Sequence, residues 1–167
     1  KHVYPGFIAP NTTLGLIEIG AVRATNDIQE VGKYNPNIRA LIAYNTDSKI
    51  IPTVRTNGVL LAQVTPRGGR ISGTSSIMML DGWNWEDAVL KTDDGIHLNW
   101  PGIMSRDWWS DNPVTTKNKN YDTEVDELMK FFIDSKSYNE TDKPEETNVR
   151  FKAMKGLFAA PGLKVVC

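Results

Sequence analysis

The chain has a single cysteine, Cys167, at its last position, so no disulfide can form within its 167 residues. Positive and negative charges are nearly balanced: the chain has 19 Lys and Arg residues and 20 Asp and Glu residues, which gives a formal net charge of -1 at pH 7. This balance provides no basic stripe for a nucleic-acid backbone. No apolar run approaches the roughly 18 residues that span a bilayer. We therefore expect neither nucleic acid nor a membrane as a partner.

Histidine is also scarce, with only His2 and His97 in the chain. A catalytic zinc site usually takes three protein ligands, and no second candidate ligand stands close to either histidine in the sequence. The terminal cysteine leaves no Cys/His pair for nucleophilic catalysis. The phosphate-binding, dinucleotide-binding, zincin and serine-hydrolase motifs are missing as well. The residues of this chain alone therefore predict no metal centre and no catalytic group.

What remains is ordinary globular composition, with 40% hydrophobic and 23% charged residues, enough for one domain with a core. The first residue is Lys1, and strand-like patterns stand close to both ends. We therefore expect a single partial domain over residues 1–167, cut from a longer protein whose remaining polypeptide is its partner. These residues do not distinguish a periplasmic from a cytoplasmic location.

Strands and helices alternate along the chain. Apolar runs bounded by Pro, Gly and Asn predict buried strands, which we place at residues 3–8, 59–64, 77–80, 95–100 and 163–166. Helical spacing, capping residues and proline positions predict helices, which we place at 38–44, 48–56, 85–91 after Asn84, 123–136 and 144–160. In the helix after residue 122, Thr123 and Asp126 form a capping-box pattern, and one face carries Val125, Leu128, Met129 and Phe132. This order predicts an α/β fold with parallel strands.

A glycine- and hydroxyl-rich segment at residues 67–76 offers a candidate ligand loop, whose key residues are Gly68, Gly69, Ser72 and Thr74. Backbone amides in such a segment can cradle an anion. A phosphate site would need a helix to follow, whereas a strand is predicted there. A crossover loop without a ligand is therefore the competing interpretation.

All five tryptophans fall between residues 83 and 109, interleaved with Asn and Asp: Trp83, Trp85, Trp100, Trp108 and Trp109. Aromatic rings beside amide and carboxylate groups are typical of sugar recognition. Tryptophan is also a common packing residue with one polar atom. The segment therefore supports two interpretations, a carbohydrate-binding surface and ordinary packing.

Several stretches together resemble one family. They are Val3-Tyr4-Pro5-Gly6-Phe7-Ile8, Asn57-Gly58-Val59-Leu60-Leu61-Ala62-Gln63-Val64-Thr65-Pro66, Ile71-Ser72-Gly73-Thr74, Asn148 to Phe158, and Leu163-Lys164-Val165-Val166. These segments resemble the amidohydrolase superfamily, near its imidazolonepropionase-like branch. The resemblance implies a TIM-type (β/α)8 barrel, of which this chain supplies about the first half. It also implies hydrolysis of C–N bonds in cyclic amides and related small molecules, with one or two zinc or iron ions that activate water.

The chain departs from this family at two positions. The family pattern places a His-x-His pair after Pro-Gly-Phe-Ile, and the matching residues here are Asn11 and Thr13. Neutral amide and hydroxyl oxygens replace imidazole poorly at a zinc-like ion. We therefore predict a degenerate, non-catalytic amidohydrolase-like domain that holds no metal by this route, whose Asn11 and Thr13 hydrogen-bond a ligand at the barrel mouth. Two alternatives stay open: an active C–N hydrolase with metal ligands supplied downstream, and a carbohydrate-binding module that uses residues 83–109.

Overall fold

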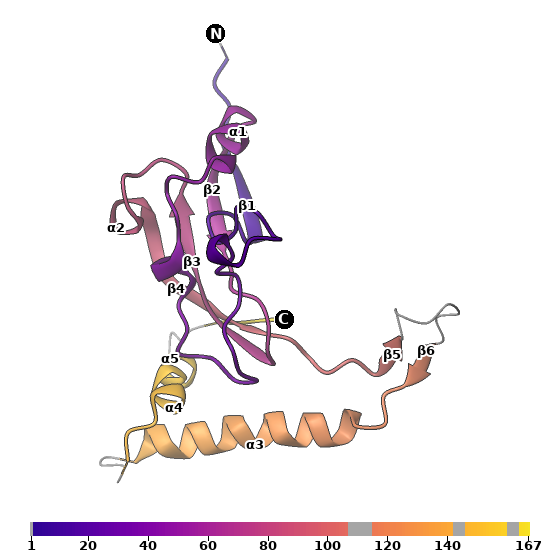
Figure 1. Cartoon of the computed structure of the whole chain (residues 1–167). Helices are drawn as coiled ribbons and strands as arrows, with labels where there is room; N and C mark the ends of the chain where they lie inside the picture. Colours follow the sequence, from indigo (N-terminus) through magenta and orange to yellow (C-terminus); the bar gives the residue numbers. More distant parts are fainter. Residues whose placement is uncertain (1, 107–114, 142–145, 160–163) are drawn as a thin grey trace.

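The computed structural model describes residues 2–106, 115–141, 146–159 and 164–167 (Figure 1). A curled sheet of five strands forms its centre, in the order β1-β2-β3-β4-β7. The strands are β1 (Phe7–Thr12), β2 (Val59–Val64), β3 (Ile71–Met79), β4 (Val89–Leu98) and β7 (Lys164–Val166). Of the five predicted strands, the one at residues 59–64 is confirmed with both ends in place.

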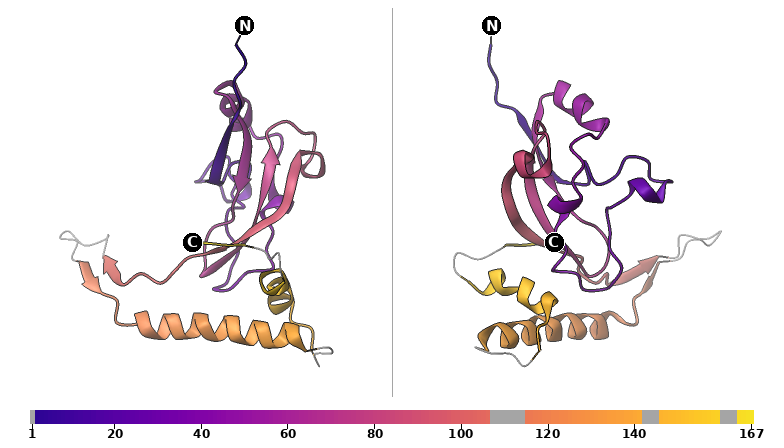
Figure 2. Two further views of the ribbon diagram at one scale, coloured as in Figure 1. Left: turned by 180° about the vertical axis from the view of Figure 1, so that it is seen from behind. Right: turned by 60° about the vertical axis from the view of Figure 1, so that its left-hand side comes forward.

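The helices are α1 (Ile50–Thr56), α2 (Trp85–Ala88), α3 (Tyr121–Glu140), α4 (Val149–Ala153) and α5 (Lys155–Phe158). Short 3-10 turns stand at Arg23–Thr25 and Ala40–Ala43, and β5 (Met104–Arg106) pairs with β6 (Thr115–Lys117) as a separate hairpin. Figure 2 shows α3 crossing below one end of the sheet, with α4 and α5 between them. Among the described helices, none combines the length and the apolar character that a membrane crossing requires.

The sheet is mixed, which corrects the prediction of a parallel sheet. β1 pairs with β2 and β4 pairs with β7 in parallel, while β3 runs antiparallel to both of its neighbours. The prediction failed because strand spacing along the sequence carries no information on direction. Two antiparallel pairings in succession restore the original direction, so β1, β2, β4 and β7 all run the same way. Their carboxyl ends therefore lie along one edge of the sheet.

Two apolar clusters pack on one face of this sheet. Ala62, Val64 and Met78 join Leu41 and Ile51 in the first cluster, which the 3-10 turn Ala40–Ala43 and α1 cover. Ile71, Ile96 and Leu98 meet Leu128 of α3 and Met154 in the second cluster. Side chains alternate between the two faces along a strand, so Ser76 and Thr74 of β3 lie on the same face. Val64 pairs with Ser76 and Ile96 pairs with Thr74, and both clusters therefore lie on that face. Gln63 and His97 consequently belong to the opposite face.

The first predicted strand is displaced. Residues 3–6 form no strand, and β1 begins at Phe7 and continues through the polar residues to Thr12. Phe7 and Ile8 are exposed rather than buried. An apolar sequence indicates only that a residue tolerates burial, and within the described residues the side chains of Phe7 and Ile8 stay 68% and 60% exposed.

The helix signals have mixed outcomes. The Asn84 cap is confirmed, because its side chain accepts a hydrogen bond from the Asp87 amide at 2.8 Å. The capping box is wrong, since Thr123 lies inside α3 and the helix begins after Asn120 without a side-chain cap. Leu128 is buried and Phe132 packs against the second cluster, but Met129 is 51% exposed. The expected helix start at Pro144 lies outside the described residues, and this last helical region forms α4 and α5.

Candidate functional site

The candidate site lies at the edge where β1, β2, β4 and β7 end together (Figure 1). In open sheets and barrels with parallel strands, the residues at the carboxyl ends and in the loops after them form the ligand site. Asn11 is the penultimate residue of β1, Gln63 that of β2 and His97 that of β4. Asn11 and Gln63 are joined there by a hydrogen bond, whereas His97 lies further along β4, opposite Gly73 of β3. Of the two sequence-predicted positions, Asn11 belongs to β1 and Thr13 follows it directly.

Asn11 has a left-handed backbone conformation, with φ 49°. Its amide donates to Gln63 Oε1 at 3.1 Å, and its carbonyl accepts from the Arg67 guanidinium at 2.7 Å. Asn is one of the few residues with a side chain that adopts this conformation readily. Within the described part of the chain, neither the Asn11 side-chain amide nor the Thr13 hydroxyl has a hydrogen-bond partner. Both groups are therefore available to a ligand.

Replacing Asn11 tests this backbone conformation. Asn11→Val is expected to lower the free energy of unfolding by about 1–2 kcal/mol relative to Asn11→Gly, because a β-branched residue is strained at positive φ and glycine is not. Urea unfolding of the two variants measures the difference. Equal stability of the two variants would show that the left-handed conformation at this position is wrong.

A polar network joins the strands behind Asn11. Gln63 Nε2 donates to Asp94 Oδ2 at 3.0 Å, and Lys91 Nζ donates to Asp94 Oδ1 at 2.6 Å. The hydrogen bond from Lys91 is the main reason why the pKa of Asp94 lies below its ordinary value of 3.8, and the Gln63 bond adds to it. Asp94 is thus an anion held in place by β2 and β4, and Gln63 connects it to the β1 backbone.

His97 is the most unusual side chain near this edge. It is only 7% exposed, and its Nε2 atom is buried without a hydrogen-bond partner in the described structure. Burial and, second, the positive charge of Arg67 lower the pKa of His97 to about 4, against the opposing effect of Asp94. His97 is therefore a neutral imidazole at pH 7. The sequence placed it in a strand but assigned it no role.

These residues do not fit a zinc or iron ion. Among the residues that the structure describes, no group of three His, Cys, Asp or Glu side chains is arranged to hold a metal. Asn11 and Thr13 offer only neutral oxygens, and both oxygens of Asp94 already accept hydrogen bonds. The Nε2 atom of His97 is enclosed. Whether the chain binds a metal stays a prediction, and no chemical step can be derived through one here.

The candidate ligand loop is divided between a turn and a strand. Residues 71–76 belong to β3, not to a loop, and their hydroxyls have internal partners: Ser72 Oγ donates to the Gly68 carbonyl and Thr74 Oγ1 to the Pro36 carbonyl. Gly69 has φ 61°, and a Cβ there would lie 2.8 Å from the Gly32 carbonyl. The turn thus needs glycine for its own packing. A ligand role for these four residues stays a prediction.

The tryptophans do not form one surface in the described structure. Trp83 is 92% exposed and precedes α2, next to the start of β4, whereas Trp100 follows the end of β4. A strand of this length separates them by roughly 30 Å. Trp85 packs against the first apolar cluster. Trp108 and Trp109 lie outside the described residues. A single stacking platform for a sugar is therefore not evident from the three tryptophans that can be placed.

Sequence reasoning missed Gln63, Arg67, Asp94 and His97 as neighbours. Their contacts depend on strand order and on an irregular register between β3 and β4 around Asp93, which has φ 49°. One signal was present: His97 stands between the apolar residues Ile96 and Leu98, so strand alternation directs it away from the core.

No protein-family model matches the sequence, and no curated protein matches it significantly. One solved structure is similar, the crystal structure of an amidohydrolase from Thermotoga maritima, with a TM-score of 0.68 and 18% sequence identity. The match covers 92% of this chain and 42% of that protein. At this identity the likeness concerns the fold. The chain therefore has a mixed α/β fold with a curled sheet, compatible with part of a barrel and similar to just under half of an amidohydrolase.

Proposed function

We propose that this chain is an amidohydrolase-like domain that contributes part of a barrel mouth but not the catalytic metal ligands. The fold likeness to an amidohydrolase over 92% of the chain supports the class. The observation that carries the non-catalytic assignment is the pair Asn11 and Thr13 at the end of β1, in place of the His-x-His of the family that the sequence resembles.

Asn11 and Thr13 favour hydrogen bonding over metal binding. An amide and a hydroxyl orient a polar small molecule well, but they bind a zinc-like ion weakly. Their side chains have no internal partner in the described residues, so a bound ligand would complete their hydrogen bonding. In this proposal the rest of the polypeptide closes a (β/α)8 barrel of the imidazolonepropionase-like type around the same mouth.

The alternative is an active C–N hydrolase whose metal is held by residues beyond this chain. The shared carboxyl edge of β1, β2, β4 and β7 favours it, since a partial barrel mouth is the place to which further strands would add ligands. Asp94 would then serve as a fixed negative charge beside the site. The carbohydrate-binding alternative has no comparable support from the placed tryptophans.

Metal analysis of the full-length protein separates these proposals. The non-catalytic assignment predicts less than one zinc or iron ion per chain after purification in the presence of these metals. The reason is that Asn11 and Thr13 replace the histidine ligands expected after β1. It also predicts no hydrolysis in a panel of cyclic amides. Elemental analysis by mass spectrometry and a product assay with and without chelator measure both quantities. Stoichiometric zinc or iron, together with hydrolysis that the chelator abolishes, would overturn the proposal in favour of the active hydrolase.

A further inference from the structure

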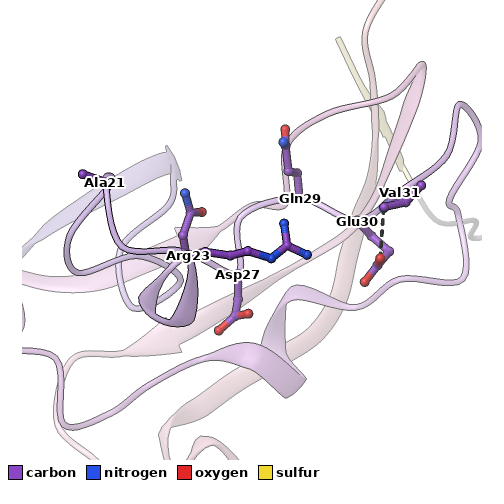
Figure 3. Close-up of a pocket in the computed structure, with 8 residues that line it drawn as sticks. Ala21, Arg23, Asp27, Gln29, Glu30 and Val31 are labelled. Carbon is purple, nitrogen blue, oxygen red and sulfur yellow. Dashed lines mark hydrogen bonds between the residues drawn. The ribbon is translucent and has the colours of Figure 1, made fainter.

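A hollow of about 470 Å³ lies over residues 20–31, in the long segment that follows β1 (Figure 3). Its volume is in the range of small-molecule sites. The side chains on its wall are mainly polar, with Arg23, Asp27, Gln29 and Glu30 the principal ones. None of these residues belongs to the strand edge described above, so the hollow is a separate feature of the chain.

The walls of this hollow are held by internal hydrogen bonds. The Thr25 hydroxyl bonds to the carbonyls of Ile19 and Val22 at 3.1 and 3.0 Å, which fixes the 3-10 turn that carries Arg23. The Asp27 amide donates to the Leu16 carbonyl at 2.8 Å, and the Arg67 amide donates to the Ile28 carbonyl at 2.6 Å. A ligand would therefore meet a largely preformed site, which lowers the entropic cost of binding.

Charges of both signs face the hollow without neutralising each other. Neither the Arg23 guanidinium nor the Asp27 carboxylate has a hydrogen bond or an ion pair within the described residues. Other arginines of the chain do pair with carboxylates, as Arg39 does with Asp93 at 2.8 Å. Figure 3 shows the Arg23 side chain extended along the hollow, with the carboxylates of Asp27 and Glu30 on the same hollow.

Glu30 adds a second negative charge, and only one of its two carboxylate oxygens accepts a hydrogen bond within the described residues. Its Oε1 accepts from the Val31 amide at 2.9 Å, the dashed contact in Figure 3. The site thus presents one guanidinium and two carboxylates. A simple anion would be repelled by Asp27 and Glu30, and a simple cation by Arg23. A molecule that carries an ammonium and a carboxylate satisfies both signs, and guanidinium binds carboxylate with two parallel hydrogen bonds.

We propose that the hollow over residues 20–31 binds a small zwitterion of the amino-acid or dipeptide class, with its carboxylate on Arg23 and its ammonium group on Asp27 and Glu30. This site goes beyond the proposed function, because it requires neither a metal nor hydrolysis and lies within one segment of this chain. The contact between Arg67 and Ile28 connects its wall to the loop after β2, beside the barrel-mouth edge.

Isothermal titration of the chain with L-alanine and with L-alanyl-L-alanine tests this site. We expect saturable binding of at least one probe, and a loss of about tenfold or more in affinity in Arg23→Gln and in Asp27→Asn, as for a charge-assisted hydrogen bond. Arg150→Gln is the matched control, an exposed arginine on α4, and should bind like the wild type. Both site residues are exposed, and circular dichroism verifies that the variants fold.

Changing the probe gives an independent readout. N-acetylation and C-terminal amidation each remove one charge, and each should weaken binding of the dipeptide by about tenfold or more. Absence of saturable binding by both zwitterions would overturn the proposal, as would equal affinity in wild type and Arg23→Gln. These results concern binding alone, so they are distinguishable from a failure of the amidohydrolase-like assignment, which metal content and hydrolysis decide.

Discussion

Lowering the pH from 6.5 to 4 is expected to reduce the free energy of unfolding by about 3 kcal/mol through His97 alone. The pKa of His97 is about 4 in the folded chain and 6.5 in the ordinary unfolded state. Between these values the unfolded chain binds the proton and the folded chain does not. Protonation therefore favours unfolding, and stability falls as the pH decreases through this window. Urea unfolding at a series of pH values measures the slope.

His97→Gln is the matched variant, because its side chain is polar but does not titrate. We expect the free energy of unfolding of this variant to depend less on pH between 6.5 and 4 than that of the wild type, whatever its stability at neutral pH. Asp94 affects only the acid end of this window: its folded pKa lies below 3.8, so its contribution begins to be lost as the pH approaches that value and is lost mainly below it. Equal slopes for wild type and His97→Gln would show that the buried, unpartnered imidazole is not the cause.

Leu128→Ala is expected to lower the free energy of unfolding by about 3 kcal/mol, because it leaves a cavity where α3 meets the sheet. Leu128 is 1% exposed and contacts the second apolar cluster, whereas the adjacent Met129 is 51% exposed. Met129→Ala should therefore change stability by no more than about 0.5 kcal/mol. Urea unfolding of both variants measures the two effects.

Hydrogen exchange adds a local measurement to this pair of variants. The first apolar cluster does not include α3, so Leu128→Ala should accelerate exchange in α3 and α4 before it affects β2. Equal destabilisation by the two substitutions, or uniform loss of protection, would contradict the division into two clusters.

The parts of the fold that depend on local sequence were predictable. β2 was placed correctly because an apolar run stands between Asn57-Gly58 and Thr65-Pro66, which are strong turn signals. The Asn84 cap was also predictable, because an N-cap depends on residues within one helical turn.

The start of β3 was missed because its residues are polar and yet buried. Ser72, Thr74, Ser75 and Ser76 read as a loop, but each hydroxyl has an internal hydrogen-bond partner, so burial costs little. No sequence rule supplies those partners, since they come from segments such as Pro36 and Gly95. Periodicity likewise does not give the direction of β3.

The end of the first strand was identified from the sequence, whereas its neighbours were not, and a ligand role for Asn11 and Thr13 stays a prediction. Asn11 and Thr13 were identified through the family resemblance, and the structure places them at the end of β1. The contact between Gln63 and Asp94 was not foreseeable, because it spans two strands that are not neighbours in the sheet. The positive φ of Asn11 gives this residue a structural reason to be present that the family comparison did not suggest.

The mixed pairing of the sheet also has a consequence for the order in which the chain folds. β2, β3 and β4 form a meander joined by short connections, whereas the bond from Asn11 to Gln63 closes a separation of 52 residues. Closing long loops costs chain entropy before any contact compensates for it. We therefore expect the meander to form first and to act as the template onto which β1 and β7 dock, so that the shared carboxyl edge is assembled last.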